Sequence, residues 1–146
     1  MPATATRPVG VFVSFDPEHD RDLYERLLGE SQAPGSGFAV CGSSRVATPT
    51  DFFGEGARAE IRDADLMIVL CGEHTEASMI VSGELRIARQ EGTACILVWG
   101  RREAMCARPR GAEPNDAMYG WTDEILRQRI DFLSRMAARE VSAAAD

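Results

Sequence analysis

The sequence predicts an α/β fold, a three-layer flavodoxin-like sandwich in which helices cover both faces of a central parallel sheet. Two observations support this prediction. Short apolar runs alternate along the chain with segments of helical periodicity, which is typical of parallel strands joined by crossover helices. The longest of these runs, residues 66–71, has no alternation of polar and apolar residues, as expected of a strand that is covered on both faces.

The first half of the chain is expected to form two strands and two helices. Residues 9–15 are rich in β-branched and aromatic side chains, which indicates a central strand. Asp16 and Pro17 follow at once, and because Asp is a preferred N-cap and Pro a preferred first helical residue, a helix is predicted from there to about Glu30. The remaining elements are a short strand at 38–41, a long connection at 42–53 and a short helix at 55–62.

The second half continues the same alternation. It is expected to contain strands at 66–71 and 94–99, with a helix at 75–91 between them. Residues 100–120 form a long irregular connection, which favours a lid, a partner surface or a ligand loop. Thr122 can cap a last helix, which is predicted to fray after Arg139.

Length and composition limit the function classes. The 146 residues predict one domain over 9–139, with disordered ends at 1–8 and 140–146. The net charge of −7 argues against a nucleic-acid partner but permits a small anionic ligand. No secretory signal or membrane-length apolar run is present, so we expect a cytoplasmic chain without membrane contact. The four cysteines are widely spaced, which predicts neither a metal site nor a disulfide.

Glu84 is an acidic residue inside an apolar helix face. It lies one turn after Ile80 and one turn before Ala88, on the side expected to face the sheet. Burying an unpaired carboxylate costs several kcal/mol or raises its pKa, so Glu84 requires a polar cleft or a partner. Two interpretations remain open here: a structural glutamate that accepts loop N–H groups or pairs with an arginine, and a catalytic carboxylate.

Several polar residues are expected near the start of this helix. The carboxyl ends of parallel strands share one edge of the sheet, where ligands bind in such folds. This edge should receive Ser14, Phe15 and Asp16, the connection that follows Cys41, and the turn at 72–78. His74 lies on that turn, either as a ligand contact or as an ordinary loop residue. An anion could bind amide groups at a helix start, at 16–19 or at 75–78.

Three segments also carry a family resemblance. Residues 11–21 (VFVSFDPEHDR) resemble an opening F-I-S-F/Y-D-x-x-x-D segment, and residues 61–75 resemble I-R-x-A-D-x-x-I-V-L-I-G-x-x-T. Residues 78–88 (SMIVSGELRIA) resemble S-x-W-V-x-x-E-I-x-x-A. In this order and spacing the set is similar to the TIR-like domain family, and in particular to the branch that contains the TIR-like subunits of bacterial Thoeris anti-phage defence.

The resemblance implies an enzyme that consumes NAD. Such a protein cleaves the nicotinamide–ribose bond and makes an ADP-ribose-type nucleotide, linear or cyclic, that signals to a separate effector protein. Glu84 aligns with the catalytic glutamate of the family, and NAD is the substrate with no further cofactor or metal. The substrate cleft is expected to include Ser14, Phe15, Asp16, Ser43, Ser44 and Ser78, with His74 beside it. The resemblance further implies self-association on activation and a phage-derived trigger.

Two departures from the family pattern are present. Ile80 replaces a tryptophan that could stack near the nicotinamide, and Cys41 replaces an aspartate at the end of the second strand. The first change removes a possible stacking contact and the second a possible polar contact, and neither alters the carboxylate. The alternative interpretation is a non-catalytic TIR-like interaction module in which Glu84 has a structural role. Hydrolysis, cyclisation and conjugation all stay open as fates of the ADP-ribosyl group.

Overall fold

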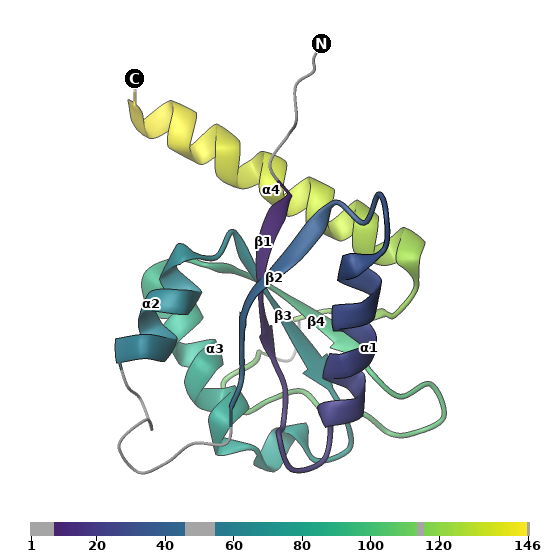
Figure 1. The fold of residues 1–146 in the computed structure, drawn as a ribbon. Helices are drawn as coiled ribbons and strands as arrows, with labels where there is room; N and C mark the ends of the chain where they lie inside the picture. Colours follow the sequence, from purple (N-terminus) through teal and green to yellow (C-terminus); the bar gives the residue numbers. More distant parts are fainter. Residues whose placement is uncertain (1–7, 46–54, 114–115, 146) are drawn as a thin grey trace.

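A five-stranded parallel sheet forms the centre of the computed structural model, which describes residues 8–45, 55–113 and 116–145 (Figure 1). The strand order is β2-β1-β3-β4-β5, and each neighbouring pair runs parallel. The strands are β1 (Val9–Ser14), β2 (Phe38–Ser43), β3 (Leu66–Cys71), β4 (Ala94–Trp99) and β5 (Met118–Gly120). Figure 1 shows β2 at the near edge of the sheet.

Helices cover both faces of this sheet, which confirms the predicted three-layer α/β architecture. The helical elements are α1 (Arg21–Gln32), α2 (Glu55–Asp63), the 3-10 turn η1 (Thr75–Ala77), α3 (Met79–Glu91) and α4 (Asp123–Ala145). Leu23 and Leu27 of α1 share one apolar core with Leu126 of α4, whereas Ile61 of α2 and Leu85 of α3 belong to the other core. The two cores lie on opposite faces of the sheet.

The central strands fill both cores. All six residues of β3 are buried, and they alternate between the two sides: Leu66, Ile68 and Leu70 join the core under α1 and α4, whereas Met67, Val69 and Cys71 join the core under α2 and α3. The predicted strands at 66–71 and 94–99 therefore have the bounds that the sequence indicated. Thr122 Oγ1 accepts a hydrogen bond from Ile125 N at 3.1 Å, so the predicted cap of the last helix is also confirmed.

The helix predicted to begin at Asp16 begins instead at Arg21. The carbonyl oxygen of Asp16 accepts hydrogen bonds from the N–H groups of His19 and Asp20, at 3.3 and 2.8 Å. Its side-chain Oδ1 accepts the N–H of Glu18 at 3.0 Å. Asp16 therefore closes a separate turn before the helix, since a short polar side chain can satisfy the backbone locally without helical geometry.

Other boundaries also differ from the prediction. The connection at 100–120 contains the strand β5, whose three residues are too few for a periodic signal. The predicted disordered tail at 140–146 is wrong as far as Ala145, because α4 continues through this alanine-rich segment of high helix propensity. The helix predicted at 75–91 is divided into η1 and α3 at Ser78. Residues 1–7 of the predicted disordered N-terminus lie outside the described residues.

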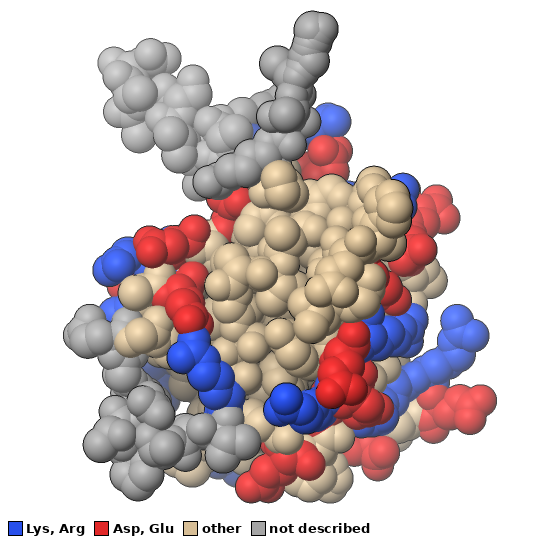
Figure 2. Space-filling model, in the orientation of Figure 1, with Lys and Arg blue, Asp and Glu red and all other residues tan. Residues whose placement is uncertain are grey.

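The edge strand β2 carries no charged residue. Figure 2 shows an uncharged area in the middle of the near face, with charged side chains over α2 and α1 on either side of it. In the register between β1 and β2, Val11 pairs with Val40 and Phe12 pairs with Gly42, so Cys41 is an extra residue in a β-bulge. Such a bulge is one way in which an exposed sheet edge is kept from pairing with another chain.

The described helices include none that is both long enough and apolar enough to cross a membrane. All four cysteines are free thiols, and Cys71 and Cys106 are buried.

Gly100 is a position where we expect a substitution to destabilise the fold. Its N–H donates to Cys71 O at 2.8 Å, and a Cβ atom there would lie 2.5 Å from Leu23 Cδ1 and 2.8 Å from Cys71 O. Gly100→Ala should therefore lower the free energy of unfolding by about 1–3 kcal/mol, as overpacking does, in a urea titration. Gly29→Ala is the matched control, because beyond the neighbouring residues and backbone of α1 itself no atom lies within 4 Å of the added methyl group. This control should be neutral or stabilising by about 0.5–1 kcal/mol, and equal curves for both variants would contradict the predicted clash.

Candidate functional site

Glu84 lies on the buried face of α3, with 7% of its surface exposed. Two serine hydroxyls donate to the same carboxylate oxygen, Oε1: Ser14 Oγ at 2.7 Å and Ser44 Oγ at 2.5 Å. Ser14 is the last residue of β1, and Ser44 directly follows β2. The predicted burial of Glu84 and its position at the carboxyl ends of the strands are therefore confirmed.

The local sequence fixes where α3 begins and which face it buries. Ser78 is the N-cap of the helix, and its Oγ accepts the N–H of Val81 at 3.3 Å. From this start, helical periodicity places Val81, Leu85 and Ala88 in the apolar core. Glu84 lies on the same buried side of the helix. Ser78 therefore acts as a helix cap in this structure, which positions Glu84 indirectly.

The β-bulge in β2 determines which serine reaches Glu84. Before the bulge, Phe38 and Val40 face the core under α1 and α4. Because Cys41 is the extra residue, the alternation is shifted, and Gly42 pairs with Phe12 on the side of α2 and α3. Ser44 therefore lies on the same face as Glu84. Ser43 pairs with Val13, whose side chain belongs to the opposite core, so Ser43 lies on the face away from Glu84, and its contact with a ligand stays a prediction.

Ser44 also ties the two strand ends together. Its Oγ accepts the N–H of Phe15 at 2.9 Å while it donates to Glu84, and its own N–H donates to Val13 O at 3.0 Å. Phe15 thus contributes its main chain to the site, whereas its ring stacks on Tyr24 with a centroid distance of 4.8 Å.

Ser44→Ala is expected to raise the pKa of Glu84 and to destabilise the fold. The substitution removes one hydrogen bond to the carboxylate and leaves the buried Phe15 N–H without its acceptor, which should cost about 1–3 kcal/mol. Chemical denaturation at pH 8 measures the loss, and Ser43→Ala is the matched control because its side chain faces away from Glu84. A loss in Ser43→Ala as large as that in Ser44→Ala would contradict the assignment.

The pKa of Glu84 reflects its surroundings. Burial is the main cause, and it raises the pKa from 4.5 to about 7. The hydrogen bonds from Ser44 and Ser14 and the positive charge of Arg45 oppose this rise, whereas the negative charge of Glu60 adds to it. Within the described part of the chain, no guanidinium group bonds to Glu84. The carboxylate is thus held by neutral donors, and its charge is not cancelled by an ion pair.

Comparisons with known proteins bear on this arrangement. No protein family model matches the sequence, and no curated protein matches it. Among solved structures, the TIR domain of the Toll-related receptor TRR-2 from Hydra magnipapillata matches with a TM-score of 0.56 and 20% sequence identity, over 90% of this chain and 97% of that chain. The chain has a TIR-domain fold. At this identity the likeness is one of fold, so it supports the TIR-like part of the resemblance and does not reach the Thoeris branch.

Asp16 and His74, two of the predicted residues, belong to a second group on the same rim of the TIR fold, and among the described residues no hydrogen bond joins this group to the Glu84 side chain. Asp16 is buried and its Oδ2 lies 2.7 Å from His19 Nδ1. The rings of His19 and His74 stack with a centroid distance of 3.9 Å. Glu18 joins Asp16 and His19 in placing possible metal-ligand atoms within 4.8 Å of one another. The hydrogen bond to Asp16 raises the pKa of His19, and the two side chains form an ion pair when the imidazole is protonated.

Sequence reasoning missed two residues near Glu84. Arg45 directly follows Ser44, and its guanidinium Nη2 pairs with Glu60 Oε1 on α2. The other oxygen of Glu60, Oε2, is buried without a hydrogen-bond partner among the described residues and lies 2.8 Å from the position that a Cβ atom of residue 42 would occupy. Gly42 therefore leaves room for the Glu60 carboxylate. The sequence carried no signal for this pair, because the two residues belong to elements that meet only in the folded chain.

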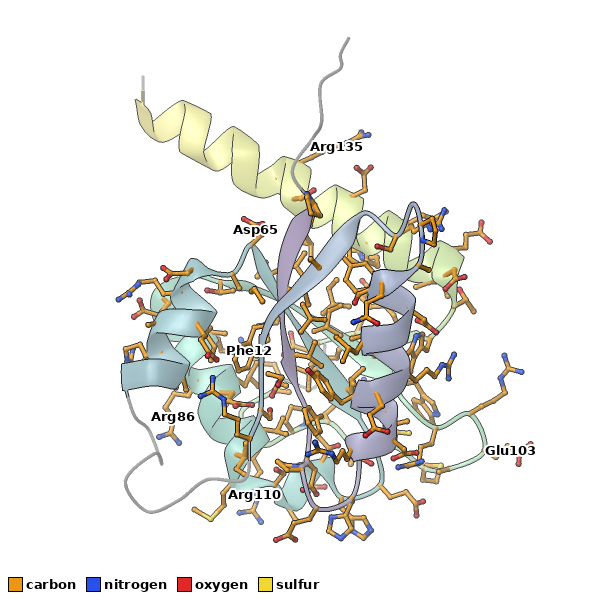
Figure 3. The ribbon with its side chains drawn as sticks, in the orientation of Figure 1. Phe12, Asp65, Arg86, Glu103, Arg110 and Arg135 are labelled. Carbon is orange, nitrogen blue, oxygen red and sulfur yellow. The ribbon has the colours of Figure 1, made fainter. Side chains whose placement is uncertain are left out.

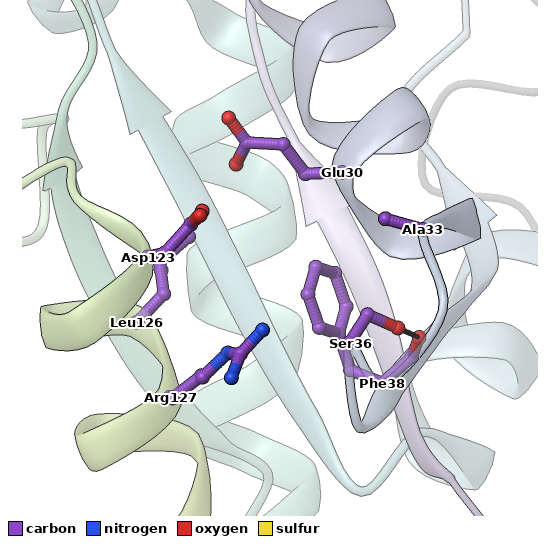
Figure 4. Close-up of a pocket in the computed structure, with 7 residues that line it drawn as sticks. All are labelled: Glu30, Ala33, Ser36, Phe38, Asp123, Leu126 and Arg127. Carbon is purple, nitrogen blue, oxygen red and sulfur yellow. Dashed lines mark hydrogen bonds between the residues drawn. The ribbon is translucent and has the colours of Figure 1, made fainter.

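A small pocket at the other end of the sheet is separate from this site (Figure 4). It lies between the end of α1 and the start of α4, beside Phe38, where β2 begins. Its lining residues are Glu30, Ala33, Ser36, Phe38, Asp123, Leu126 and Arg127. Glu84 and its serines are at the carboxyl ends of the strands, so this pocket takes no part in the candidate site.

Proposed function

We propose that this TIR-fold protein cleaves the nicotinamide–ribose bond of NAD, with Glu84 as the catalytic carboxylate. The observation that carries the proposal is a nearly buried carboxylate at the carboxyl edge of the sheet, held on one oxygen by Ser14 and Ser44 and by no guanidinium group of the described chain. Ligands bind at this edge in open α/β folds. A raised pKa at such a position is characteristic of functional sites.

The reaction needs little beyond a positioned negative charge. When the C1′–N bond breaks, its electron pair remains on the nicotinamide nitrogen, which converts a cationic ring into a neutral leaving group. No general acid is required for this step. The ribose becomes an oxocarbenium-like cation, which a carboxylate stabilises by its charge and by accepting hydrogen bonds from the ribose hydroxyls. These interactions strengthen as positive charge develops, so they act on the transition state more than on the substrate.

Ser14 and Ser44 are suited to prepare the carboxylate for this role. Their hydrogen bonds fix Oε1 and lower the pKa of Glu84 relative to a carboxylate that is buried without donors. Ser14 ends β1 and Ser44 directly follows β2, so both are held by rigid elements of the central sheet. A carboxylate fixed before substrate arrives requires little reorganisation during the reaction.

The product depends on the nucleophile that reaches C1′. Water adds to C1′ and loses a proton to give ADP-ribose, an adenine nitrogen of the same molecule closes a cyclic isomer, and another nucleophile gives a conjugate. We further propose, from the resemblance to TIR-like defence subunits, that the product is a signalling nucleotide in bacterial anti-phage defence. Self-association and a phage-derived trigger belong to the same proposal.

Bacterial cells that express the wild type or Glu84→Gln during phage infection provide the test. Mass spectrometry of the small molecules should show loss of NAD, release of nicotinamide and an ADP-ribose-type product with the wild type alone. Equal nicotinamide release from both proteins would remove Glu84 from the mechanism. No product from the wild type, in the presence of the trigger and in its self-associated form, would favour the non-catalytic interaction module.

A further inference from the structure

Cleavage of NAD at Glu84 would place a diphosphate one ribose away from this carboxylate, so the site requires a group that holds a phosphate. The protein carries a formal net charge of −7, which repels an anionic substrate unless a local cation attracts it. The position of Arg45 is suited to this purpose. It is the residue after Ser44, whose hydroxyl bonds to Glu84, and 62% of its side chain is exposed.

Arg45 is held by a contact that a phosphate can replace. Its partner on α2, Glu60, is partly exposed, with 31% of its side chain accessible. Exposed ion pairs of this kind contribute only about 0–1 kcal/mol. An arginine binds phosphate through two parallel N–H···O bonds, which are stronger than a single contact to one carboxylate oxygen. A diphosphate can therefore compete with Glu60 for the guanidinium of Arg45.

Other cations near the rim are less suitable. Arg101 donates to Asp20, to both carboxylate oxygens of Asp22 and to His19 O, so its donors are engaged. Arg110 is exposed at the lower rim in Figure 3, on the connection between β4 and β5. It belongs to neither of the strand ends that hold Glu84, so it is less suitable than Arg45. Because its side chain is exposed on the same rim, it is the rival candidate for the phosphate contact.

The amide groups that the sequence offered as anion sites are already used. At residues 16–19, the N–H groups of Glu18 and His19 donate to oxygens of Asp16. At residues 75–78, the N–H groups of Ala77 and Ser78 donate to His74 O and Thr75 O. These predicted backbone sites therefore have fewer free donors than the sequence suggested.

We infer that Arg45 binds the diphosphate of the dinucleotide and is held by Glu60 until the substrate arrives, an inference that rests on the proposed NAD-cleaving function. Arg45 is then a substrate-binding residue, and Glu60 is a positioning residue that keeps the guanidinium beside Ser44. The segment from Gly42 to Arg45 would connect both parts of the substrate site, since Ser44 contacts the carboxylate and Arg45 contacts the phosphates.

Steady-state kinetics with two substrates test the inference. Arg45→Gln should raise KM for NAD about tenfold, equivalent to about 1.4 kcal/mol, with kcat within twofold of the wild type. It should leave the cleavage of nicotinamide riboside, which has no phosphate, unchanged. Arg45→Lys should recover part of the loss, because it keeps the charge but not the paired donors. Arg58→Gln is the matched control. Arg58 pairs with Glu91 at the far end of α3, so its loss should change KM and kcat for neither substrate.

A binding measurement separates failure of this inference from failure of the proposed function. Titration calorimetry in the Glu84→Gln background compares NAD with nicotinamide riboside, with Arg45 present or replaced by Gln. NAD binding that depends on Arg45, without any cleavage by the wild type, would support the inference and overturn the enzymatic proposal. The inference alone would be overturned if Arg45→Gln weakened the binding of NAD and of nicotinamide riboside equally. It would also be overturned if Arg110→Gln weakened NAD binding and Arg45→Gln did not. No NAD binding in this background with Arg45 present would overturn both the inference and the enzymatic proposal.

Discussion

Glu84→Gln is expected to lower the rate of nicotinamide release from NAD by about 10²- to 10³-fold, which corresponds to about 3–4 kcal/mol of transition-state stabilisation. The amide retains the size of the side chain and an oxygen that can accept hydrogen bonds from Ser14 and Ser44. It loses the negative charge opposite the developing oxocarbenium centre. The measurement is nicotinamide release by the purified, self-associated protein at saturating NAD.

Glu76→Gln is the control for this loss of charge. Glu76 lies in η1, near the start of α3, and its side chain is exposed, so the substitution removes a negative charge from the same rim without touching the carboxylate site. Its rate should stay within about twofold of the wild type, since exposed charges are screened by solvent. Comparable losses in the two variants would indicate a general effect of rim charge and would contradict a specific role for Glu84.

The free energy of unfolding of the wild type, relative to Glu84→Gln, is expected to fall by about 3 kcal/mol as the pH rises from 4.5 to 7. Burial raises the pKa of Glu84 from 4.5 to about 7 in the folded protein. Between these pH values the folded protein holds a proton that the unfolded chain has released, so stability decreases with pH. Below pH 4.5 and above pH 7 the difference should be constant.

Urea titrations of both proteins at several pH values measure this difference. His19 and Asp20 also have raised pKa values, and those of Asp22 and Asp116 are lowered, but these groups titrate in both proteins and cancel in the comparison. The variant should be at least as stable as the wild type at pH 8. If the two stability curves ran parallel throughout, the raised pKa of Glu84 would be refuted.

Together, the two results distinguish a catalytic glutamate from a structural one. A structural glutamate that contributes to folding would make Glu84→Gln less stable at pH 8, whereas a carboxylate retained for catalysis lowers stability when it ionises in a buried position. Loss of activity combined with equal or higher stability at pH 8 is therefore the expected signature. Unchanged activity combined with lower stability of Glu84→Gln at pH 8 would support the interaction module.

Much of the fold follows from local periodicity. The apolar runs at 66–71 and 94–99 became β3 and β4 with the same bounds, because a strand covered on both faces has few alternatives. The apolar face of the helix carried Glu84 toward the sheet, as its spacing required. Asp16 was predicted less well, since its side chain and carbonyl can satisfy either a helix start or a separate turn, and local sequence does not distinguish them.

The sequence alone determined the layered α/β architecture, the buried position of Glu84 and the strand end that brings Ser14 close to it. Only the tertiary structure decided that Ser44 and not Ser43 completes the site, and that Arg45 pairs with Glu60. The physical reason is that periodicity assigns a side chain to a face only while the alternation is unbroken. The extra residue at Cys41 shifts that alternation, and a bulge depends on how β2 pairs with β1, a contact between segments distant in the chain.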